Sequence, residues 1–393
     1  MISTILTEQI ALLKEELVKL RRILHAQPEL SFEEFETTNF VCRYLEELGI
    51  PYERTEPTGV IATIEGGKTG KTVALRADMD ALPVQQLNDV PYASKVDGKM
   101  HACGHDAHTS MLLVAAKALM CVKDELQGNI RLIFQPAEEI GAGAKKMIPQ
   151  GAMKEVDEVF GIHIWSQMPT NTVSCPVGPT FAAADLFTIR FTGKGGHGAM
   201  PEACIDAAVM ASSFVMNAQT VVSRVVDPQE PAVLTIGKMD VGTKANIIAE
   251  NAVIEGTVRT FNQDVRDTIE AEMKRYATKT AELYDGTVAV EYIRGTQPVI
   301  NEERSAHLVQ QIAKEAFGEQ VLYDEKPTMG AEDFSIYLDH APGAFALVGC
   351  GNAEKDTEWA HHHGKFNIDE DALQTGAELY AQYAWSYLEN TKK

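Results

Sequence analysis

The spacing of apolar residues in the first half of the chain predicts helices and strands in alternation. Apolar positions three and four apart indicate helices, and short unbroken apolar runs indicate buried strands. Helices are expected at residues 5–24, 33–48, 109–122 and 142–150, and strands at residues 60–64, 72–77, 129–134 and 159–164. The 109–122 segment is apolar on nearly every face, which is typical of a buried helix. Strands that alternate with helices favour a mostly parallel sheet with helices on both faces.

The pattern changes near Asp185, where apolar and polar residues begin to alternate one by one. From there the order of expected elements is β-α-β-β-α-β, which is that of a ferredoxin-like unit. The elements are expected at residues 186–192, 205–222, 232–239, 252–260, 265–283 and 287–293. After Pro298 the chain returns to helices and short apolar strands. The sequence therefore predicts an α/β domain over 1–184 and 297–393, interrupted by an inserted α+β domain over 185–296.

Composition and charge exclude some classes of binding partner. The 393 residues are 45% hydrophobic and 23% charged, as in ordinary globular proteins, and 35 basic against 56 acidic side chains give a net charge of −21. Such a surface repels nucleic-acid phosphates and anionic membrane faces, so neither is expected as a partner. No apolar run approaches the ~18 residues of a membrane span. The first 30 residues lack a signal-peptide layout, so a cytoplasmic protein is expected.

Two glycine-rich segments resemble nucleotide-binding loops without meeting their requirements. Gly66–Thr72 has Glu65 where a phosphate loop needs its first glycine, and it precedes a strand, so a hairpin turn is expected there. Gly193–Gly198 fits the G-x-G-x-x-G spacing, but no dinucleotide-binding βαβ unit surrounds it.

Residues of the kind that bind metals gather at the ends of the apolar strands. Each has an ordinary structural explanation when taken alone, such as a core histidine or acids at a helix start. Together, a thiolate, imidazoles and carboxylates at one sheet edge are the donor set of a divalent metal site. The donors are Asp78 and Asp80, Cys103 and His105, Glu138 and Glu139, His163, and His361 to His363.

The number of donors favours two metal ions that share a water. Five side-chain ligands from this set already exceed what one tetrahedral catalytic ion with an open position needs. The adjacent Glu138 and Glu139 then suggest a division of labour, in which one coordinates and the other takes a proton from the metal-activated water.

Several motifs resemble the M20 family of metallohydrolases, and specifically its amidohydrolase branch, which holds hippurate, N-acyl-amino-acid and auxin-conjugate hydrolases. The resemblance runs in the right order from Arg21 to about Leu373. It rests on Arg76–Pro83 (RADMDALP), Met100–His108 (MHACGHDAH), Gln135–Glu139 (QPAEE), Gly161–His163, Gly193–Gly198 and Met329–Phe334 (MGAEDF). It implies a zinc-peptidase-like fold whose inserted domain serves as lid and dimer contact.

The resemblance also implies a role for each matching residue. The metal ligands would be Cys103, His105, Glu139, His163 and one histidine of 361–363. The family's last ligand stands two residues before a proline in an H-x-P-x-[FY] pattern. That position points to His362, although Gly364 takes the place of the proline and leaves His361 and His363 as alternatives. The ions would be Mn²⁺ or Zn²⁺, with Co²⁺ or Ni²⁺ as alternatives.

Glu138 falls on the family's general base and Asp80 on an acid that steadies a metal-binding histidine. In the inserted domain, His197 would reach the active site of a partner subunit and bind the reacting carbonyl oxygen. Asn246 and Arg259 resemble the residues that bind the substrate carboxylate, although Ala249 stands where the family often has proline. In the E-D-F motif, Asp333 is expected to cap a helix.

The expected activity is hydrolysis of an N-acyl amino acid to a carboxylic acid and a free amino acid by a homodimer. A dipeptidase or a carbamoyl hydrolase on the same scaffold is the alternative enzyme. A non-catalytic small-molecule binding protein would have lost Glu138 or a ligand, and the sequence retains all of them.

Overall fold

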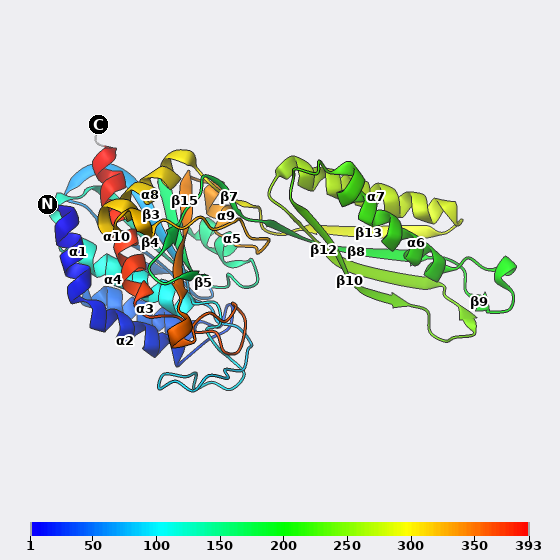
Figure 1. Ribbon diagram of the computed structural model, residues 1–393, viewed down its shortest axis with the longest axis horizontal. Coiled ribbons are helices and arrows are strands. Elements are labelled where there is room, and N and C mark those ends of the chain that lie inside the picture. The colour runs from blue at the N-terminus through cyan, green and yellow to red at the C-terminus, as the bar shows by residue number, and fades with distance from the viewer. Residues whose placement is uncertain (1, 392–393) are drawn as a thin grey trace. The chain divides into compact units, whose positions relative to one another are not determined.

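A seven-stranded sheet organises the part of the chain that carries the ligand-type residues (Figure 1). The computed structural model describes residues 2–391, and its contacts divide them into two units. The first unit comprises the described residues up to Thr180, Ile300–Lys326, and those from Asp333 onward. The second comprises Phe181–Val299 and Pro327–Glu332, a short stretch that the sequence analysis had placed with the first.

The first unit contains most of the helices. Its strands are β1 (Tyr52–Arg54), β2 (Val60–Glu65), β3 (Lys68–Asp78), β4 (Gln127–Gln135), β5 (Glu158–Pro169), β6 (Val173–Ser174) and β15 (Gly343–Gly351). Its helices are α1 (Ile2–Leu12), α2 (Lys14–His25), α3 (Phe35–Glu47), α4 (His105–Met120), α5 (Gly143–Met147), α8 (Glu303–Phe317), α9 (Ser335–Leu338) and α10 (Ala372–Asn390). The single helix predicted for residues 5–24 is two helices that meet at Leu13.

The sheet has the strand order β1-β2-β4-β3-β5-β15-β6, and its centre is parallel. β4, β3, β5 and β15 run in the same direction, whereas the outer strands pair antiparallel. α4 and α10 bury one face in a large apolar core, where the Phe160 ring stacks on Tyr383. On the other face the Phe334 ring, just before α9, packs against Phe345 of β15. This arrangement confirms the predicted α/β fold with a parallel sheet centre.

The predicted hairpin at Gly66–Gly70 is wrong, because β2 and β3 do not pair with each other. β4 lies between them and pairs with both. The glycines serve close packing instead. A Cβ at Gly66 would lie 2.3 Å from the carbonyl oxygen of Gly128, and one at Gly67 would lie 2.2 Å from that of Asp124.

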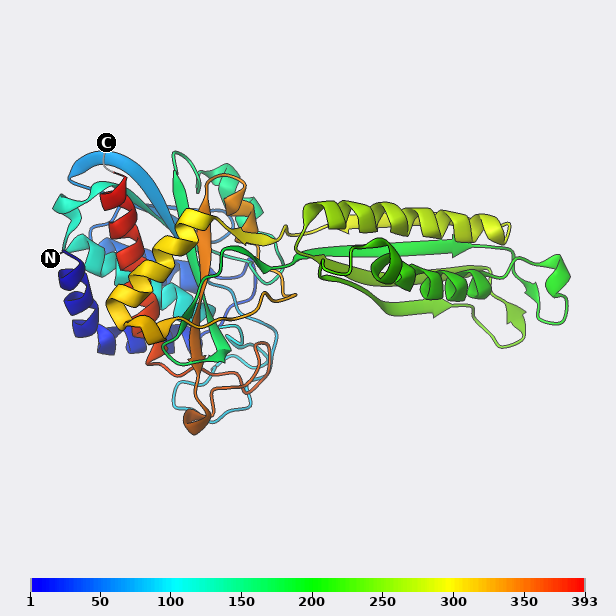
Figure 2. The same cartoon turned by 45° about the horizontal axis from the view of Figure 1, so that its top comes forward.

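The second unit is a four-stranded antiparallel sheet with the order β10-β12-β8-β13 (Figure 2). α6 and α7 share one apolar core with the inward residues of β8, among them Phe187, Ile189 and Phe191. On the opposite face of the sheet, Leu186 and Ile293 are exposed. This is the ferredoxin-like order expected from the sequence. Its elements are β8 (Ala183–Thr192), β9 (Gly196–His197), α6 (Ala207–Thr220), β10 (Ala232–Val241), β11 (Ile247–Ile248), β12 (Asn251–Thr260), α7 (Gln263–Leu283) and β13 (Thr287–Arg294).

Two short strands, β7 (Gly178–Phe181) and β14 (Val299–Asn301), lie where the chain passes from the first unit into the second and back. Across residues 2–391, no helix combines the length and the apolar character that crossing a membrane requires.

The parallel strands bring distant parts of the chain to one sheet edge. β3 ends at Asp78 and β4 ends at Gln135, and the two are paired at these last residues. Because the carboxyl ends of parallel strands meet at the same edge, the segments that follow them lie beside one another.

Candidate metal centre

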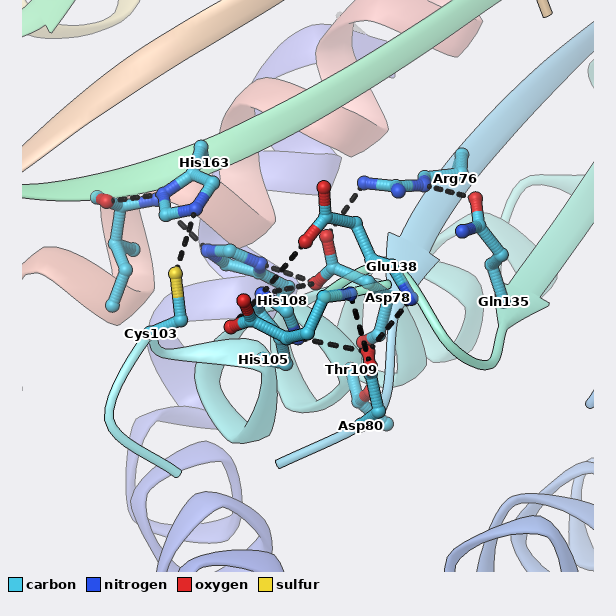
Figure 3. A network of polar contacts seen from close by, with 12 residues as sticks. Arg76, Asp78, Asp80, Cys103, His105, His108, Thr109, Gln135, Glu138 and His163 are labelled. Carbon is cyan, nitrogen blue, oxygen red and sulfur yellow. Dashed lines mark hydrogen bonds and ion pairs between the residues drawn. The ribbon is translucent and has the colours of Figure 1, made fainter. Parts of the chain in front are cut away.

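Four of the segments that carry metal-ligand candidates meet at this sheet edge (Figure 3). Asp80 lies two residues beyond β3, Glu138 and Glu139 follow β4, and His163 lies within β5. Cys103 precedes α4, and His105 is the first residue of that helix. Gly104 between them has φ +96°, and a Cβ there would lie 2.4 Å from the Ile164 side chain. Only glycine therefore lets the chain place the thiol and the imidazole so close together.

His163 is oriented as a neutral metal ligand. Its Nδ1 donates to the backbone oxygen of Ile164 at 2.6 Å, so its Nε2 carries the lone pair. That Nε2 lies 3.4 Å from the Cys103 Sγ. Burial, together with the neighbouring His108 and His361, holds the pKa of His163 well below its usual range. The ring is therefore uncharged and able to coordinate at neutral pH.

His105 presents a buried nitrogen that has no hydrogen-bond partner among the described residues. Its Nδ1 donates to Asp80 at 3.2 Å, which leaves Nε2 as the unpartnered atom. Nε2 lies 3.8 Å from Glu139 Oε1, a second buried atom that accepts no hydrogen bond from a described residue, and 4.0 Å from Glu138 Oε2. Two orphaned buried ligand atoms that face each other are costly unless something binds between them.

The electrostatics around His105 favour a positive charge at this point. Burial opposes a charge on the ring, but the carboxylates of Asp78 and Asp80 outweigh it and raise the pKa of His105 to about 10. Burial and the same two carboxylates raise the pKa of Glu139 to about 7. A cation bound between His105 and Glu139 would relieve the repulsion among the acids.

The spacing of the donors also fits metal coordination. Two ligands of a tetrahedral zinc-sized ion lie about 3.3–3.8 Å apart, given bonds of roughly 2.0–2.3 Å. The distances of 3.4 Å from Cys103 to His163, 3.8 Å from His105 to Glu139 and 3.4 Å from Glu139 to His362 fall in this range. The five predicted ligands, together with Glu138, form overlapping groups whose atoms lie within 4.8 Å of one another: Cys103 with His105 and His163, Cys103 with Glu139 and His362, and His105 with Glu138 and Glu139. The residues present therefore fit a metal centre.

The three consecutive histidines have different surroundings. His362 has φ +66°, its backbone N–H donates to Ala102 beside Cys103, and its Nε2 lies 3.4 Å from Glu139 Oε2. His361 accepts a hydrogen bond at Nε2 from the Ser166 N–H, and its Nδ1 lies 3.8 Å from the Cys103 Sγ. His363 is exposed and stacks on Trp359. The geometry favours His362 as the ligand.

Asp80 anchors more than the histidine that the sequence analysis assigned to it. Its Oδ1 accepts from His105 Nδ1 and from the Glu138 N–H at 3.1 Å. Its Oδ2 accepts from the Glu139 N–H at 3.1 Å and from the Ser31 hydroxyl at 2.7 Å. One buried carboxylate thus orients a ligand ring and the backbone of both glutamates.

His108 is held away from coordination by hydrogen bonds at both nitrogens. Its Nδ1 donates to Asp78 at 2.6 Å, and its Nε2 accepts from the Ile164 N–H at 2.9 Å. It therefore links the end of β3 to the middle of β5, beside His163. The sequence showed this histidine in the H-A-C-G-H-D-A-H motif, but only the tertiary contacts reveal that it braces a ligand strand.

A buried arginine beneath the site was not singled out from the sequence. Arg76 donates to Asp78 at 2.6 Å, to Gln135 at 2.8 Å and to Asp333 at 2.9 Å. The prediction that Asp333 caps the helix that follows it is wrong. Its carboxylate accepts from Arg76, Gln135 and the Ala144 N–H, in the first turn of α5. The signal in the sequence that could have pointed to Arg76 was a charged residue within an otherwise apolar strand.

The three substrate-binding candidates all lie in the second unit, but not together. β9 pairs with β11 so that His197 lies opposite Ile247, and the Gly198 N–H donates to the Asn246 oxygen. Arg259 lies near the other end of β12, opposite Ala184. The eight steps from Asn251 to Arg259 along β12 span about 26 Å of strand. His197 and Asn246 are thus neighbours, and Arg259 is remote from both within this unit.

Comparison with known proteins places the chain in a family. A model described as peptidase family M20/M25/M40 matches residues 74–386. The chain is 43% identical to an N-acetyl-L-cysteine deacetylase of Bacillus subtilis (strain 168), over 92% of this chain and 85% of the relative. It is 41% identical to thermostable carboxypeptidase 2 of Saccharolobus solfataricus, over 94% of each.

A solved structure agrees with these matches. The YXEP protein of Bacillus subtilis, described as a dinuclear metal binding peptidase from the M20 family, superimposes with a TM-score of 0.87 at 35% identity, and covers 97% of this chain and 100% of its own. The match extends over both units and includes the segments that form the metal centre. The chain therefore belongs to the M20/M25/M40 peptidase family and is a metal-binding hydrolase of amide bonds.

Proposed function

We propose that the protein is a dinuclear metalloenzyme that hydrolyses N-acyl amino acids to a carboxylic acid and a free amino acid. The observation that carries the proposal is the facing pair of unpartnered ligand atoms, His105 Nε2 and Glu139 Oε1, with the Glu138 carboxylate beside them. The names of two relatives support the substrate class. A deacetylase of N-acetyl-L-cysteine and a carboxypeptidase both cleave an amide adjacent to a free carboxylate.

In this proposal Cys103, His105, Glu139, His163 and His362 hold two divalent ions. Such ions polarise a carbonyl group and lower the pKa of water toward ~7. The Cys103 thiolate favours Zn²⁺, and the carboxylate accepts Mn²⁺.

Glu138 serves as general base and then as general acid. Its backbone N–H is held by Asp80, and its Oε2 lies 4.0 Å from His105 Nε2, so the carboxylate lies next to the ligand cluster without being needed to complete it. It takes the proton of the attacking water and returns it to the leaving amide nitrogen. Proton transfer by a positioned side chain contributes about 10²–10⁴-fold to a rate.

The second unit supplies the groups that bind the substrate. The Ala199 N–H donates to Nδ1 of His197, so the exposed imidazole carries its proton on Nε2 and can donate it to a carbonyl oxygen. Arg259 is half-buried, and no described carboxylate lies within ion-pair distance of it, because Arg266 engages the nearby Asp185. A half-buried guanidinium without an acidic partner suits the carboxylate of an amino acid.

We further propose that the enzyme is a homodimer with shared sites. His197 and Asn246 lie by the β9–β11 pair, which precedes β12 at its Asn251 end, and about 26 Å of strand separates that end from Arg259. One copy of the unit is therefore not expected to bring all three to one small substrate. Two chains, one providing Arg259 and the other providing His197 and Asn246, could do so. The second unit then acts as the lid and dimer contact.

A substrate panel with metal analysis on the same sample tests the proposal. N-acetyl- and N-benzoyl-amino acids, dipeptides and N-carbamoyl amino acids are assayed after chelation and reloading with Zn²⁺, Mn²⁺ or Co²⁺. Turnover of the acyl amino acids is expected to dominate, and preferential cleavage of dipeptides or carbamoyl compounds would favour the alternative enzymes. Glu138→Gln should lose at least 10²-fold in kcat while retaining metal. The exposed Glu53→Gln is its matched control.

Mixed dimers test the shared site. Glu138→Gln and His197→Ala chains are each expected to be inactive alone. After random mixing, roughly a quarter of the parental activity should return, because half of the dimers are mixed and each contains one intact site. No recovery would contradict the shared-site arrangement.

A further inference from the structure

We propose that Glu34 is a positioning residue that holds the turn carrying Glu138 and Glu139 in its working conformation. This inference rests on the proposed function of that turn. Neither the motifs nor the spacing of the sequence drew attention to Glu34, which lies in the loop before α3 and 103 positions away from the residue that it contacts.

The Glu34 side chain does not do what its place in the chain suggests. It occupies the N-cap position of α3, where a carboxylate normally accepts a hydrogen bond from the first turn of its own helix. No such bond forms. Instead Oε1 accepts from the Ala137 N–H at 2.9 Å and Oε2 accepts from the Thr58 hydroxyl at 2.6 Å. The side chain is completely buried, so the carboxyl group is committed to these partners.

Its partner, Ala137, has a backbone conformation that needs support. Ala137 is buried with φ +55°, in the left-handed region that residues with a Cβ disfavour. Its carbonyl oxygen accepts from the N–H groups of Ala142 and Gly143 at 3.2 and 3.1 Å. With Glu34 on its N–H, both polar groups of this strained residue are fixed. Ala137 directly precedes Glu138, so its dihedral angles set the direction in which both glutamates leave the strand.

Glu34 and Asp80 together hold three consecutive amides. The N–H of Ala137 points to Glu34, and the N–H groups of Glu138 and Glu139 point to the two oxygens of Asp80. Asp80 alone cannot replace the missing contact, because its oxygens already serve those two amides as well as His105 and Ser31. Loss of Glu34 would leave a buried N–H unsatisfied at the one residue of the turn that is strained.

The contact requires an oxygen acceptor rather than a negative charge. Burial and, to a smaller extent, the Asp80 carboxylate raise the pKa of Glu34 to about 7, although the hydrogen bond from Thr58 opposes the shift. A protonated carboxyl group still offers a carbonyl oxygen to the Ala137 N–H. Glutamine has the same shape and the same acceptor, so it should preserve the turn where alanine would not.

The test compares Glu34→Ala and Glu34→Gln with Glu33→Ala in the full-length, metal-loaded enzyme. Glu33 is the matched control, because it is the adjacent glutamate and is exposed. Glu34→Ala is expected to lower kcat by about ten- to one-hundred-fold with a smaller change in KM, the usual effect of removing a group that orients a metal-site residue. Glu34→Gln should restore most of that loss, and Glu33→Ala should match the parent. A parental kcat in Glu34→Ala would overturn the assignment.

Hydrogen exchange gives a readout that is independent of activity. Peptides covering residues 134–142 are followed by mass spectrometry in the full-length chain after chelation. Glu34→Ala should speed exchange in these peptides, whereas Glu34→Gln and Glu33→Ala should not. Equal protection in all variants would overturn the assignment, even if the substrate panel showed no turnover by the parent and so refuted the proposed function. Parental turnover combined with unchanged protection in Glu34→Ala would refute the positioning role alone.

A second-site variant separates positioning from a general loss of folding. Glycine adopts left-handed dihedral angles without strain. Ala137→Gly in the Glu34→Ala background is therefore expected to recover at least three-fold in kcat. Failure to recover, with parental unfolding temperatures, would refute the claim that Glu34 acts by holding Ala137.

Discussion

Replacing Asp80 with asparagine should weaken metal binding without unfolding the protein. The carboxylate accepts four hydrogen bonds, two at each oxygen, from His105, Ser31 and the Glu138 and Glu139 amides. Asparagine keeps one acceptor oxygen and places an NH₂ group where the other stood. In either orientation that NH₂ group faces a backbone N–H, so one glutamate amide loses its acceptor and meets a second donor.

The size of the effect follows from that lost contact. A buried donor left without an acceptor costs about 1–3 kcal/mol. Since roughly 1.4 kcal/mol corresponds to a tenfold change in an equilibrium constant, metal affinity should fall by about 5- to 150-fold. The fall should be shared by any ion that the centre binds, because the altered contacts orient His105 and Glu139 and do not select the metal.

Competition with a chromophoric chelator measures the affinity for Zn²⁺ directly. Asp89→Asn is the control, because Asp89 lies in an exposed loop and the substitution is the same. Urea unfolding of the metal-free proteins shows whether Asp80→Asn has remained folded. A folded Asp80→Asn protein that binds Zn²⁺ as tightly as the parent would refute the idea that Asp80 sets the geometry of the centre.

Three further measurements test other parts of the structure. His362→Ala should lose bound metal and activity, whereas the neighbouring His363→Ala should retain both; the reverse result in metal analysis would move the ligand to His363. Arg76→Met leaves two buried carboxylates without their cation and should reduce the free energy of unfolding by about 3–5 kcal/mol in urea; a loss below about 1 kcal/mol would contradict the role of this ion-pair network. The unfolded chain ionises Glu34 near pH 4.5 and the folded chain only near pH 7, so in the metal-free protein the contribution of Glu34 to stability should fall by roughly 3 kcal/mol as pH rises through that window. Glu34→Gln should flatten this slope, and parallel pH profiles would disprove the shift.

The local sequence pattern was sufficient where burial alone decides the structure. The apolar runs at 72–77, 129–134 and 159–164 correspond to β3, β4 and β5, because a strand buried on both faces must be apolar throughout. The same reasoning identified the ferredoxin-like order of the second unit. It failed at Gly66–Gly70, because the strand that pairs with both β2 and β3 comes more than fifty residues later.

The residue types likewise showed which chemistry the site could perform. They did not show which role each residue has. The motifs brought His105, His108 and His163 to attention together. Only the contacts distinguish His108, whose two nitrogens are hydrogen-bonded to Asp78 and the Ile164 N–H, from His105 and His163, which each turn Nε2 toward the other predicted ligands. A histidine's role depends on what each ring nitrogen meets, and that is a property of neighbours distant in the chain.

The sequence by itself determined the family, the alternation of strands and helices, and the types of ligand gathered at the sheet edge. Tertiary structure alone decided that His362 approaches Glu139, that Asp333 pairs with Arg76, and that Glu34 reaches Ala137. The physical reason is that periodicity records how much of a side chain is buried. It carries no information about which partner, tens or hundreds of residues away, satisfies a buried polar group.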